Sequence, residues 1–380
     1  MDMILDEIAN EFDQCIKCGL CLATCPVGKA LFLEKYTPRG KVQLAKRYAA
    51  GDLPISEQYR DIFTKCLLCG ACTVTCPSGV DQKSVFLTMR EEIANQRGLH
   101  PNVEAAVSSL VDQHNISDED NSERGDWRED IRNLPAHQYE KPQAEVIYFV
   151  GCVASFFPMV QSIPQNMVRI LESAGIDFAI LAGEEWCCGF PLMGAGAPQE
   201  MKALMEHNLE KVKALGAEEV VFSCPSCYRT WKEHYPTDLK LSHSTQLIER
   251  LITQGAISLG ELNETVTYHD PCDLGRNAGV FEPPREILKA IPGLTLVEMA
   301  ANRNQSICCG GGGNLEMTDP ALSARIAQQK IEQINETGAQ TVVTACQQCV
   351  RTIKGKVRRE KLDLRVVDIT DMVVKSMSKG

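Results

Sequence analysis

The hydrophobic pattern of the N-terminal quarter of the chain has the spacing of amphipathic helices. Apolar residues recur at intervals of three and four positions, and the alternation typical of a half-buried strand is absent. The predicted helices are Met3–Phe12, Lys41–Ala49, Ser56–Thr64 and Gln82–Gln96. We therefore expect an all-helical domain over residues 1–98.

Residues 99–143 depart from this pattern and read as an acidic linker. The stretch Ser117–Asp130 is acidic and poor in apolar residues, which is typical of a solvated connection. Trp127 and Ile131 are apolar exceptions, so part of the segment has the means to pack on a neighbouring domain.

From residue 144 onward, short apolar strands alternate with helices. The predicted strands are Val146–Val150, Phe178–Leu181, Val220–Ser223, Thr265–His269, Leu294–Val297 and Thr341–Thr344. The predicted helices are Pro164–Ala174, Gln199–Ala214, Pro284–Ile291 and Ala321–Glu336, with others after Pro225 and from Gln348. This alternation predicts a mainly parallel α/β architecture with helices on the faces of the sheet.

This α/β half is duplicated at an offset of about 121 residues. Leu209–Glu233 aligns with Ile331–Gly355 without a gap, so we predict two related domains, residues 144–258 and 259–380. Ligands bind beyond the carboxyl ends of strands in such sheets. Four cysteines are expected at those ends: Cys152, Cys224, Cys272 and Cys346.

Bulk composition excludes several classes of protein. The net charge of −11 over 380 residues gives no basic excess for nucleic-acid binding. The acidic N-terminus does not resemble a secretory signal. No apolar run reaches the roughly 18 residues of a membrane span, so membrane contact would come only through a partner. Abundant thiols without a leader favour a reducing, cytoplasmic compartment.

All 18 cysteines fall into motifs, and none is left over. Two runs of the form C-x2-C-x2-C-x3-C-P repeat at an offset of 51, and two longer motifs of the form C-x34-35-CCG-x35-36-C-x2-C follow. The short runs are Cys15, Cys18, Cys21, Cys25 and Cys66, Cys69, Cys72, Cys76. The long motifs are Cys152, Cys187, Cys188, Cys224, Cys227 and Cys272, Cys308, Cys309, Cys346, Cys349. Clustered thiolates select iron–sulfur clusters, zinc or Cu(I).

The two short runs match the bacterial two-cluster ferredoxin pattern, in which the fourth cysteine of each run ligates the other run's cluster. That resemblance implies one cubane [4Fe–4S] cluster on Cys15, Cys18, Cys21 and Cys76, and another on Cys66, Cys69, Cys72 and Cys25. The 40 residues between Cys25 and Cys66 leave room for two helices, which favours an all-helical ferredoxin domain. The alternative is a pair of structural zinc sites, which typically use paired C-x2-4-C knuckles instead.

Five cysteines in each long motif exceed the four that close a cubane. Two adjacent cysteines do not easily point into one compact cubane, but they can hold neighbouring irons of an opened cluster. The glycines that follow, Gly189 and Gly310–Gly313, allow close backbone approach and supply N–H donors to sulfur. A phosphate-binding role for that glycine run has weaker support, because the rest of such a motif is missing.

The doubled long motif resembles the cysteine-rich CCG domain pair in the B subunit of heterodisulfide reductase. Its fusion behind a two-cluster ferredoxin domain resembles the D subunit of the same enzyme. Supporting segments are SCPSCYRTWKEHYP (Ser223–Pro236), YHDPCDLGR (Tyr268–Arg276) and CCGGGGNLEM (Cys308–Met317). The same architecture, with TPRGKVQLAK (Thr37–Lys46) and CPSGV (Cys76–Val80), is similar to iron–sulfur subunits of glycolate oxidase, lactate dehydrogenase and anaerobic glycerol-3-phosphate dehydrogenase.

The resemblance implies two noncubane [4Fe–4S] clusters, each held by all five cysteines of a long motif. It also implies an iron–sulfur subunit of an oxidoreductase whose flavin lies on another subunit, since no nucleotide-binding fingerprint is present. Two alternatives stay open: a subunit that cleaves a disulfide at the noncubane clusters, and a subunit of a lactate- or glycolate-type dehydrogenase. One departure from the family is Asp273, where many relatives carry histidine.

Candidate residues outside the cysteines are few. His269 and Asp270 precede Cys272 and are placed to relay protons or to donate hydrogen bonds to sulfur, or to serve only as local backbone caps. His243 begins a helix and reads as structural. Arg39 either lies near a ferredoxin cluster or simply follows a helix start. The basic segment Arg351–Arg365 reads as a solvated helix face or, alternatively, a docking surface for an acidic redox partner.

Overall fold

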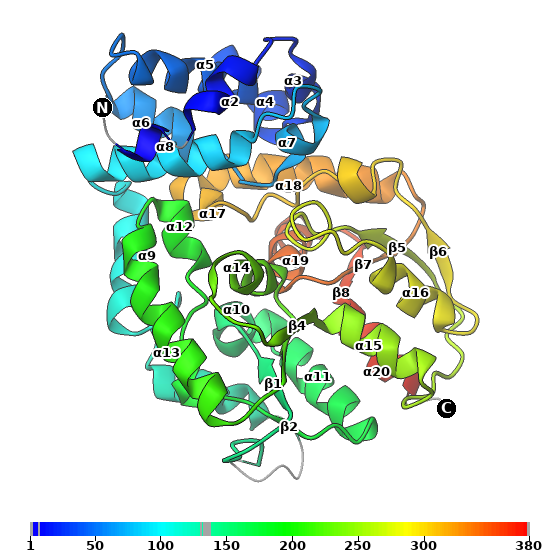
Figure 1. The fold of residues 1–380 in the computed structure, drawn as a ribbon. Coiled ribbons are helices and arrows are strands. Elements are labelled where there is room, and N and C mark those ends of the chain that lie inside the picture. The colour runs from blue at the N-terminus through cyan, green and yellow to red at the C-terminus, as the bar shows by residue number, and fades with distance from the viewer. Residues whose placement is uncertain (1–2, 7, 130, 132–137, 378–380) are drawn as a thin grey trace.

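The computed structural model describes residues 3–6, 8–129, 131 and 138–377. Helices of the N-terminal unit gather at one end of the molecule, above two α/β domains (Figure 1). The N-terminal elements are α1 Met3–Asp6, α2 Ala9–Gln14, α3 Leu20–Thr24, α4 Pro26–Leu31, η1 Glu34–Tyr36, α5 Pro38–Ala49, α6 Glu57–Thr64, α7 Ala71–Thr75 and α8 Gln82–Arg97. The predicted all-helical N-terminal fold is therefore confirmed, although the helix expected over Met3–Phe12 is divided into α1 and α2, with residue 7 outside the described residues.

The segment expected as a linker carries two helices of its own, α9 Pro101–Asp112 and the 3-10 helix η2 Asn121–Arg128. Within η2, Arg124 and Trp127 are each only 1% exposed. The burial of Trp127 agrees with the expectation that part of this segment packs on a neighbouring domain. Arg124 departs from the expected solvated connection, because it too lies against the first α/β domain.

Each α/β domain holds one four-stranded parallel sheet. The first sheet has the order β2-β1-β3-β4 and the second the order β6-β5-β7-β8, which confirms the duplicated parallel fold. The strands are β1 Val146–Phe149, β2 Phe178–Ala179, β3 Glu219–Phe222, β4 Lys240–His243, β5 Thr265–His269, β6 Thr295–Val297, β7 Thr341–Thr344 and β8 Arg365–Asp368. The two inner strands of each sheet are rich in β-branched and aromatic residues and are almost fully buried, because helices cover both faces.

The edge strands β4 and β8 are absent from the sequence prediction. Each is four residues long and begins with an exposed basic residue, Lys240 or Arg365, so its apolar signal is weak. Arg365 therefore does not continue a basic helix: α19 ends at Glu360, and Arg365 opens β8.

Helices from the two domains pack across a common interface. Helix α15 packs on α16, and α11 packs on the C-terminal helix α20. The helices of the first domain are α10 Cys152–Phe156, η3 Pro158–Val160, α11 Ser162–Ser173, η4 Ala182–Glu184, α12 Phe190–Ala195, η5 Pro198–Glu200, α13 Met201–Ala214, α14 Pro225–His234 and α15 Ser244–Thr253. Those of the second are α16 Glu282–Ala290, η6 Arg303–Gln305, α17 Leu315–Thr318, α18 Pro320–Asn335, α19 Gln347–Glu360 and α20 Ile369–Met377. The N-terminal unit rests on α12 through α8 and on α18 through α4 (Figure 1).

Candidate metal centres

The first N-terminal thiol set brings together cysteines from both short runs. Its cavity is lined by Cys15, Cys18, Cys21 and Cys76. Gly19, just before α3, is in the left-handed region (φ +86°), and a Cβ there would lie 2.8 Å from an Arg39 guanidinium nitrogen. Arg39 also donates to the Lys17 carbonyl (3.1 Å) and so lies against the cysteine loop, while Pro38 begins α5. Both interpretations of the Pro38-Arg39-Gly40 segment, a residue near the thiols and a helix start, therefore hold together.

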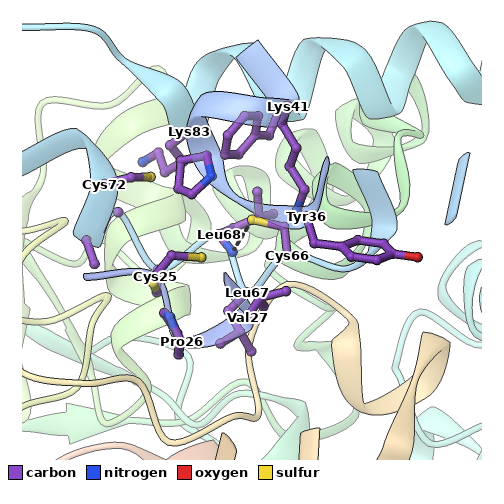
Figure 2. Close-up of a pocket in the computed structure, with 15 residues that line it drawn as sticks. Cys25, Pro26, Val27, Tyr36, Lys41, Cys66, Leu67, Leu68, Cys72 and Lys83 are labelled. Carbon is purple, nitrogen blue, oxygen red and sulfur yellow. Dashed lines mark hydrogen bonds between the residues drawn. The ribbon is translucent and has the colours of Figure 1, made fainter. Parts of the chain in front are cut away.

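The second N-terminal thiol set shows the reciprocal exchange. Cys25 lines one pocket with Cys66, Cys69 and Cys72 (Figure 2). Backbone N–H groups point at two of these sulfurs: Gly28 N lies 3.3 Å from Cys25 Sγ, and Leu68 N lies 3.4 Å from Cys66 Sγ. Burial raises the pKa of Cys25 to about 12. A bound metal would have to displace that proton, as thiolate ligation requires.

Each CCG thiol set forms at the carboxyl edge of its sheet. Because β1 pairs with β3 and β5 with β7, the cysteines that follow these strands reach the same edge. The adjacent cysteines lie in the loop after β2 or β6 and complete the set. The first CCG set is Cys152, Cys187, Cys188, Cys224 and Cys227, linked by thiol–thiol interactions. The second CCG set is Cys272, Cys308, Cys309, Cys346 and Cys349, in which the sulfurs of Cys309 and Cys349 are 3.3 Å apart.

A buried ion pair flanks the first CCG set. Arg124 places Nη2 3.3 Å from Cys152 Sγ and 2.9 Å from a Glu185 carboxylate oxygen. Both side chains are 1% exposed, and Glu185 also accepts hydrogen bonds from the backbone N–H groups of Val150 and Gly151. Arg124 was not predicted from the sequence, since it lies in an acidic stretch far from any cysteine. For Glu185 the available signal was its position two residues before Cys187.

The first CCG set faces a cavity of about 380 Å³. All five of its cysteines line that cavity, opposite Gly311–Gly313, Glu316 and Arg351 of the second domain. Arg351 is paired with Glu316 (2.9 Å) and lies 4.5 Å over the Phe157 ring. Arg351 therefore belongs to the cavity wall and departs from the expectation of a solvated helix face. The remaining wall is largely apolar, with Ile116, Phe190, Pro191 and Met317.

The second CCG set is enclosed by polar side chains instead. His269 is 1% exposed, and its nearest ring nitrogen lies within 4.8 Å of the sulfurs of Cys309 and Cys349. No described nitrogen or oxygen hydrogen-bonds to either ring nitrogen, and the interaction that remains to the ring is with the Cys309 thiol. Burial lowers the pKa of His269 and lowers that of nearby Lys330 to about 8.

Asp270 plays a different part from its neighbour His269. Its carboxylate is bridged by two Arg285 nitrogens (2.7 and 2.9 Å) and accepts the backbone N–H of Arg303 (2.7 Å). Asp270 therefore anchors the loop that leads to Cys308, whereas His269 faces the thiols. His243, at the end of β4, caps α15 through its ring nitrogen, as expected of a structural residue.

The second N-terminal set and the second CCG set meet directly. The Cys308 thiol interacts with Cys69 and lowers the pKa of Cys69 to about 6. The glycine run fits against the Cys66-Leu67 backbone: a Cβ on Gly313 would lie 2.4 Å from the Cys66 carbonyl oxygen. Arg90 fastens the junction by donating to the carbonyls of Cys66 (2.7 Å) and Gly313 (2.8 Å). The glycines are thus required for close approach of two loops.

Each C-x2-C loop of the α/β half reaches across to the other CCG set. Ser226, between Cys224 and Cys227, donates to Asp273 (2.7 Å), and Arg229 adds a second contact at 2.6 Å. In the opposite direction, Gln347 donates to the Val150 carbonyl (2.7 Å) and Ser223 Oγ (2.9 Å). Asp273, the departure from the family pattern, is therefore a buried bridge between the domains.

Comparison with known proteins supports this arrangement of thiols. The 4Fe-4S dicluster domain matches residues 11–80, and the cysteine-rich domain CCG matches residues 146–232 and 266–354. The D subunit of the dihydromethanophenazine:CoB–CoM heterodisulfide reductase of Methanosarcina acetivorans is 31% identical over 97% of this chain and 94% of its own length. This chain belongs to the heterodisulfide reductase D-subunit family.

Other relatives of this D-subunit family member are named for different functions. The EtfAB:quinone oxidoreductase of Syntrophomonas wolfei is 25% identical over 97% of this chain and 58% of its own length. The B subunit of the fumarate reductase (CoM/CoB) of Methanothermobacter marburgensis is 27% identical over 94% and 71%. A solved hypothetical protein from Helicobacter pylori, 10% identical, covers 99% of this chain and 76% of its own with a TM-score of 0.57, which shows the fold alone.

The predicted resemblance and fold class are confirmed by these matches. The chain is an iron–sulfur oxidoreductase subunit, and two of the relatives described above are named as subunits of reductases. The four thiol sets fit iron–sulfur clusters, because soft thiolates ligate iron and backbone N–H groups donate hydrogen bonds to the cysteine sulfurs. Over the described residues, no helix has the length and apolar character needed to cross a membrane.

Proposed function

We propose that this chain is the electron-transfer subunit of a cytoplasmic, flavin-containing oxidoreductase complex. The cofactors would be two cubane [4Fe–4S] clusters on the N-terminal sets and two noncubane clusters on the CCG sets. When bound, such clusters supply one-electron redox chemistry. The flavin would lie on a partner subunit.

The observation that carries this proposal is the junction between Cys69 and Cys308. Two thiol sets from different domains approach each other there: the glycine run packs against the Cys66-Leu67 backbone, and Arg90 donates to carbonyls of both loops. Electron exchange between the N-terminal unit and the α/β half needs such an approach. A structural role alone gives no reason for it.

The residues at this junction have separable tasks. Arg276 donates to the Cys69 carbonyl (2.9 Å) and to the Asn304 carbonyl (3.3 Å), so it holds the loop before Cys308 against the N-terminal unit. Lys330 and His269, both buried, hold polar or positive groups beside the second CCG set. Positive charge near a site favours its reduced, more negative form.

The test is metal analysis followed by spectroscopy on anaerobically purified protein. Four four-iron clusters predict about 16 iron and 16 sulfide per chain. Reduction of the N-terminal clusters should be followed by reduction of the CCG clusters in freeze-quench electron paramagnetic resonance. About eight iron would contradict the assignment of the CCG sets, and zinc in place of iron would contradict the redox function.

The cavity favours a second candidate function, reduction of a disulfide at the first CCG set. A disulfide that accepts two electrons and two protons gives two thiols. The cavity of about 380 Å³ would hold the cluster against its cysteines, and a small organic disulfide would enter the outer part, beside Phe157 and Arg351. An oxidised-state signal that shifts when thiols or disulfides are added would support this function. A signal indifferent to both would leave the electron-transfer role alone.

A further inference from the structure

Exposed apolar side chains are concentrated on the N-terminal unit. Of the seven large hydrophobic residues exposed among the described residues, six lie between positions 16 and 74, and the α/β half has none. They are Ile16, Leu20, Phe32, Leu33, Leu53 and Val74, with Val111 of α9 as the seventh. A globular surface rarely gathers such residues without a binding role.

One of these residues, Ile16, lies at the first N-terminal set, and three others are in α3 or just after α4, which pack on each other. Ile16 is 67% exposed and lines the cavity of that set, beside Cys18, which is itself exposed. Arg39 joins this loop to the turn after α4, because it donates both to the Lys17 carbonyl and to Glu34 (2.7 Å). Phe32 precedes that turn in a left-handed conformation (φ 55°) and is 84% exposed.

The charge of this region is opposite to that of the chain. Residues 15–41 contain five Lys and Arg and one acidic residue, a net charge of +4. Because the whole chain carries −11, the rest of the chain carries −15. Within the described part of the chain, Lys17 and Lys29 are exposed and take part in no ion pair with another described residue. Lys29 lies three residues before Phe32, near the end of α4.

We propose that Ile16, Lys17, Leu20, Lys29, Phe32 and Leu33 form a docking face for an acidic protein that carries a redox group near its own surface. The apolar residues would bury against the partner, and the lysines would steer its approach. The face lies over an exposed cysteine of a metal-binding set, which singles out an electron carrier. This inference rests on the proposed electron-transfer function.

The basic helix α19 is a weaker candidate for the same role. Arg351 is paired with Glu316, Lys354 donates to the Met159 carbonyl and Lys356 is paired with Glu360. Its apolar residues Val350, Ile353 and Val357 are buried. Arg358 and Arg359 at its end are exposed, but no exposed large apolar residue accompanies them among the described residues, whereas the docking face combines exposed cations with exposed apolar side chains.

The test is anaerobic stopped-flow reduction of the metal-loaded chain by a reduced plant-type ferredoxin, a small acidic protein. We expect Lys17→Glu/Lys29→Glu to lower the second-order rate constant about tenfold at low salt and to weaken its salt dependence. Phe32→Ser/Leu33→Ser should lower it several-fold at any salt. Lys202→Glu and Val111→Ser, on exposed positions elsewhere, are the matched controls and should leave it unchanged.

Reduced methyl viologen, a small reductant that needs no docking face, distinguishes failure of the docking face from failure of the electron-transfer function. If it reduces every variant at the wild-type rate while ferredoxin discriminates among them, the docking face is supported. If ferredoxin reduces the docking-face variants as fast as the controls, the docking face is wrong and the electron-transfer function stands. If neither reductant reduces the bound clusters, the proposed function itself fails.

A basic, apolar surface also suits an anionic membrane. Sedimentation with phosphatidylglycerol vesicles tests this directly. Binding that is lost in Phe32→Ser/Leu33→Ser, with no loss of ferredoxin reactivity, would overturn the acidic-protein partner. Absence of vesicle binding together with slower reduction by ferredoxin would support it.

Discussion

The two CCG sets share one cysteine layout and have opposite surroundings. The first set faces a cavity of about 380 Å³ and is flanked by the buried Arg124–Glu185 pair. The second is covered by the N-terminal unit and is bordered by His269 and Lys330. Both domains therefore keep the cysteines at the carboxyl ends of their strands, but the side chains around each set differ.

This difference shows that the spacing of the cysteines does not determine which residues surround each set. Three residues before the first cysteine of each motif, Phe149 stands in the first domain and His269 in the second. Asn208 in the first domain corresponds to Lys330 in the second. Under the proposed function, the second set would receive electrons from the N-terminal unit, and the first would be the set that a solute can reach.

The largest effect should come from removing one thiol at the junction. Cys308→Ser should abolish reduction of the CCG sets through the N-terminal unit and remove about four of some 16 iron atoms. Cys187→Ser, which alters the corresponding position of the first CCG set, should remove similar iron yet leave the second set reducible. Freeze-quench spectroscopy with iron analysis checks both. Equal behaviour of the two variants would contradict the difference between the sets.

A second test concerns the bridge that holds the sets together. Arg229→Met leaves the buried Asp273 carboxylate without its ion-pair partner and should lower the free energy of unfolding by about 3–5 kcal/mol. The double variant Arg229→Met/Asp273→Leu should recover most of that loss, because no uncompensated charge remains. Denaturant unfolding measures the double variant and both single variants, Arg229→Met and Asp273→Leu. If the losses of the single variants simply add, the two residues are not coupled.

Much of this architecture was accessible from sequence because of repetition. Cysteine spacing and the 121-residue offset predicted both α/β domains, and the inner strands were apolar enough to find. The edge strands β4 and β8 escaped because each opens with an exposed basic residue. Boundaries at residues 98, 143 and 258, like the ligand roles of individual cysteines, stay predictions.

The residues that distinguish the two sets were mostly out of reach. Arg124 approaches Cys152 across 28 residues of sequence, and Arg90 joins loops more than 220 residues apart. Such contacts depend on how domains pack, which periodicity does not encode. His269 was found only because it lies three residues before a cysteine, and its approach to Cys309 and Cys349 required the packed structure to be seen.

A third test exchanges one feature of the sets. His269→Phe gives the second set the residue of the first and removes a polar group beside Cys309. A hydrogen bond contributes about 1 kcal/mol, which for one electron corresponds to a fall in potential of about 40 mV. His269→Gln keeps a donor and should shift the potential less. Redox titration followed by paramagnetic resonance measures both potentials. An unchanged potential in His269→Phe would show that His269 does not contribute to the difference between the two CCG sets.

The smallest effect should appear in how pH acts on the two sheets. His243 and Asp368 end the equivalent edge strands β4 and β8. Burial lowers the pKa of His243 to about 3 and raises that of Asp368 to about 7. Because the folded state disfavours protonation of His243, this group lowers stability as pH drops below about 6.5. Because the folded state disfavours ionisation of Asp368, this group lowers stability as pH rises from about 4 to 7.

These opposite signs give a matched pair of variants. Asp368→Asn should raise the free energy of unfolding by about 1 kcal/mol at pH 8 and have no such effect at pH 4, because the native carboxyl is already neutral there. His243→Gln should reduce the loss of stability between pH 6.5 and pH 5. Thermal unfolding across this range measures both. A stabilisation by Asp368→Asn that is the same at pH 4 and pH 8 would show that packing, not ionisation, separates the two strand ends.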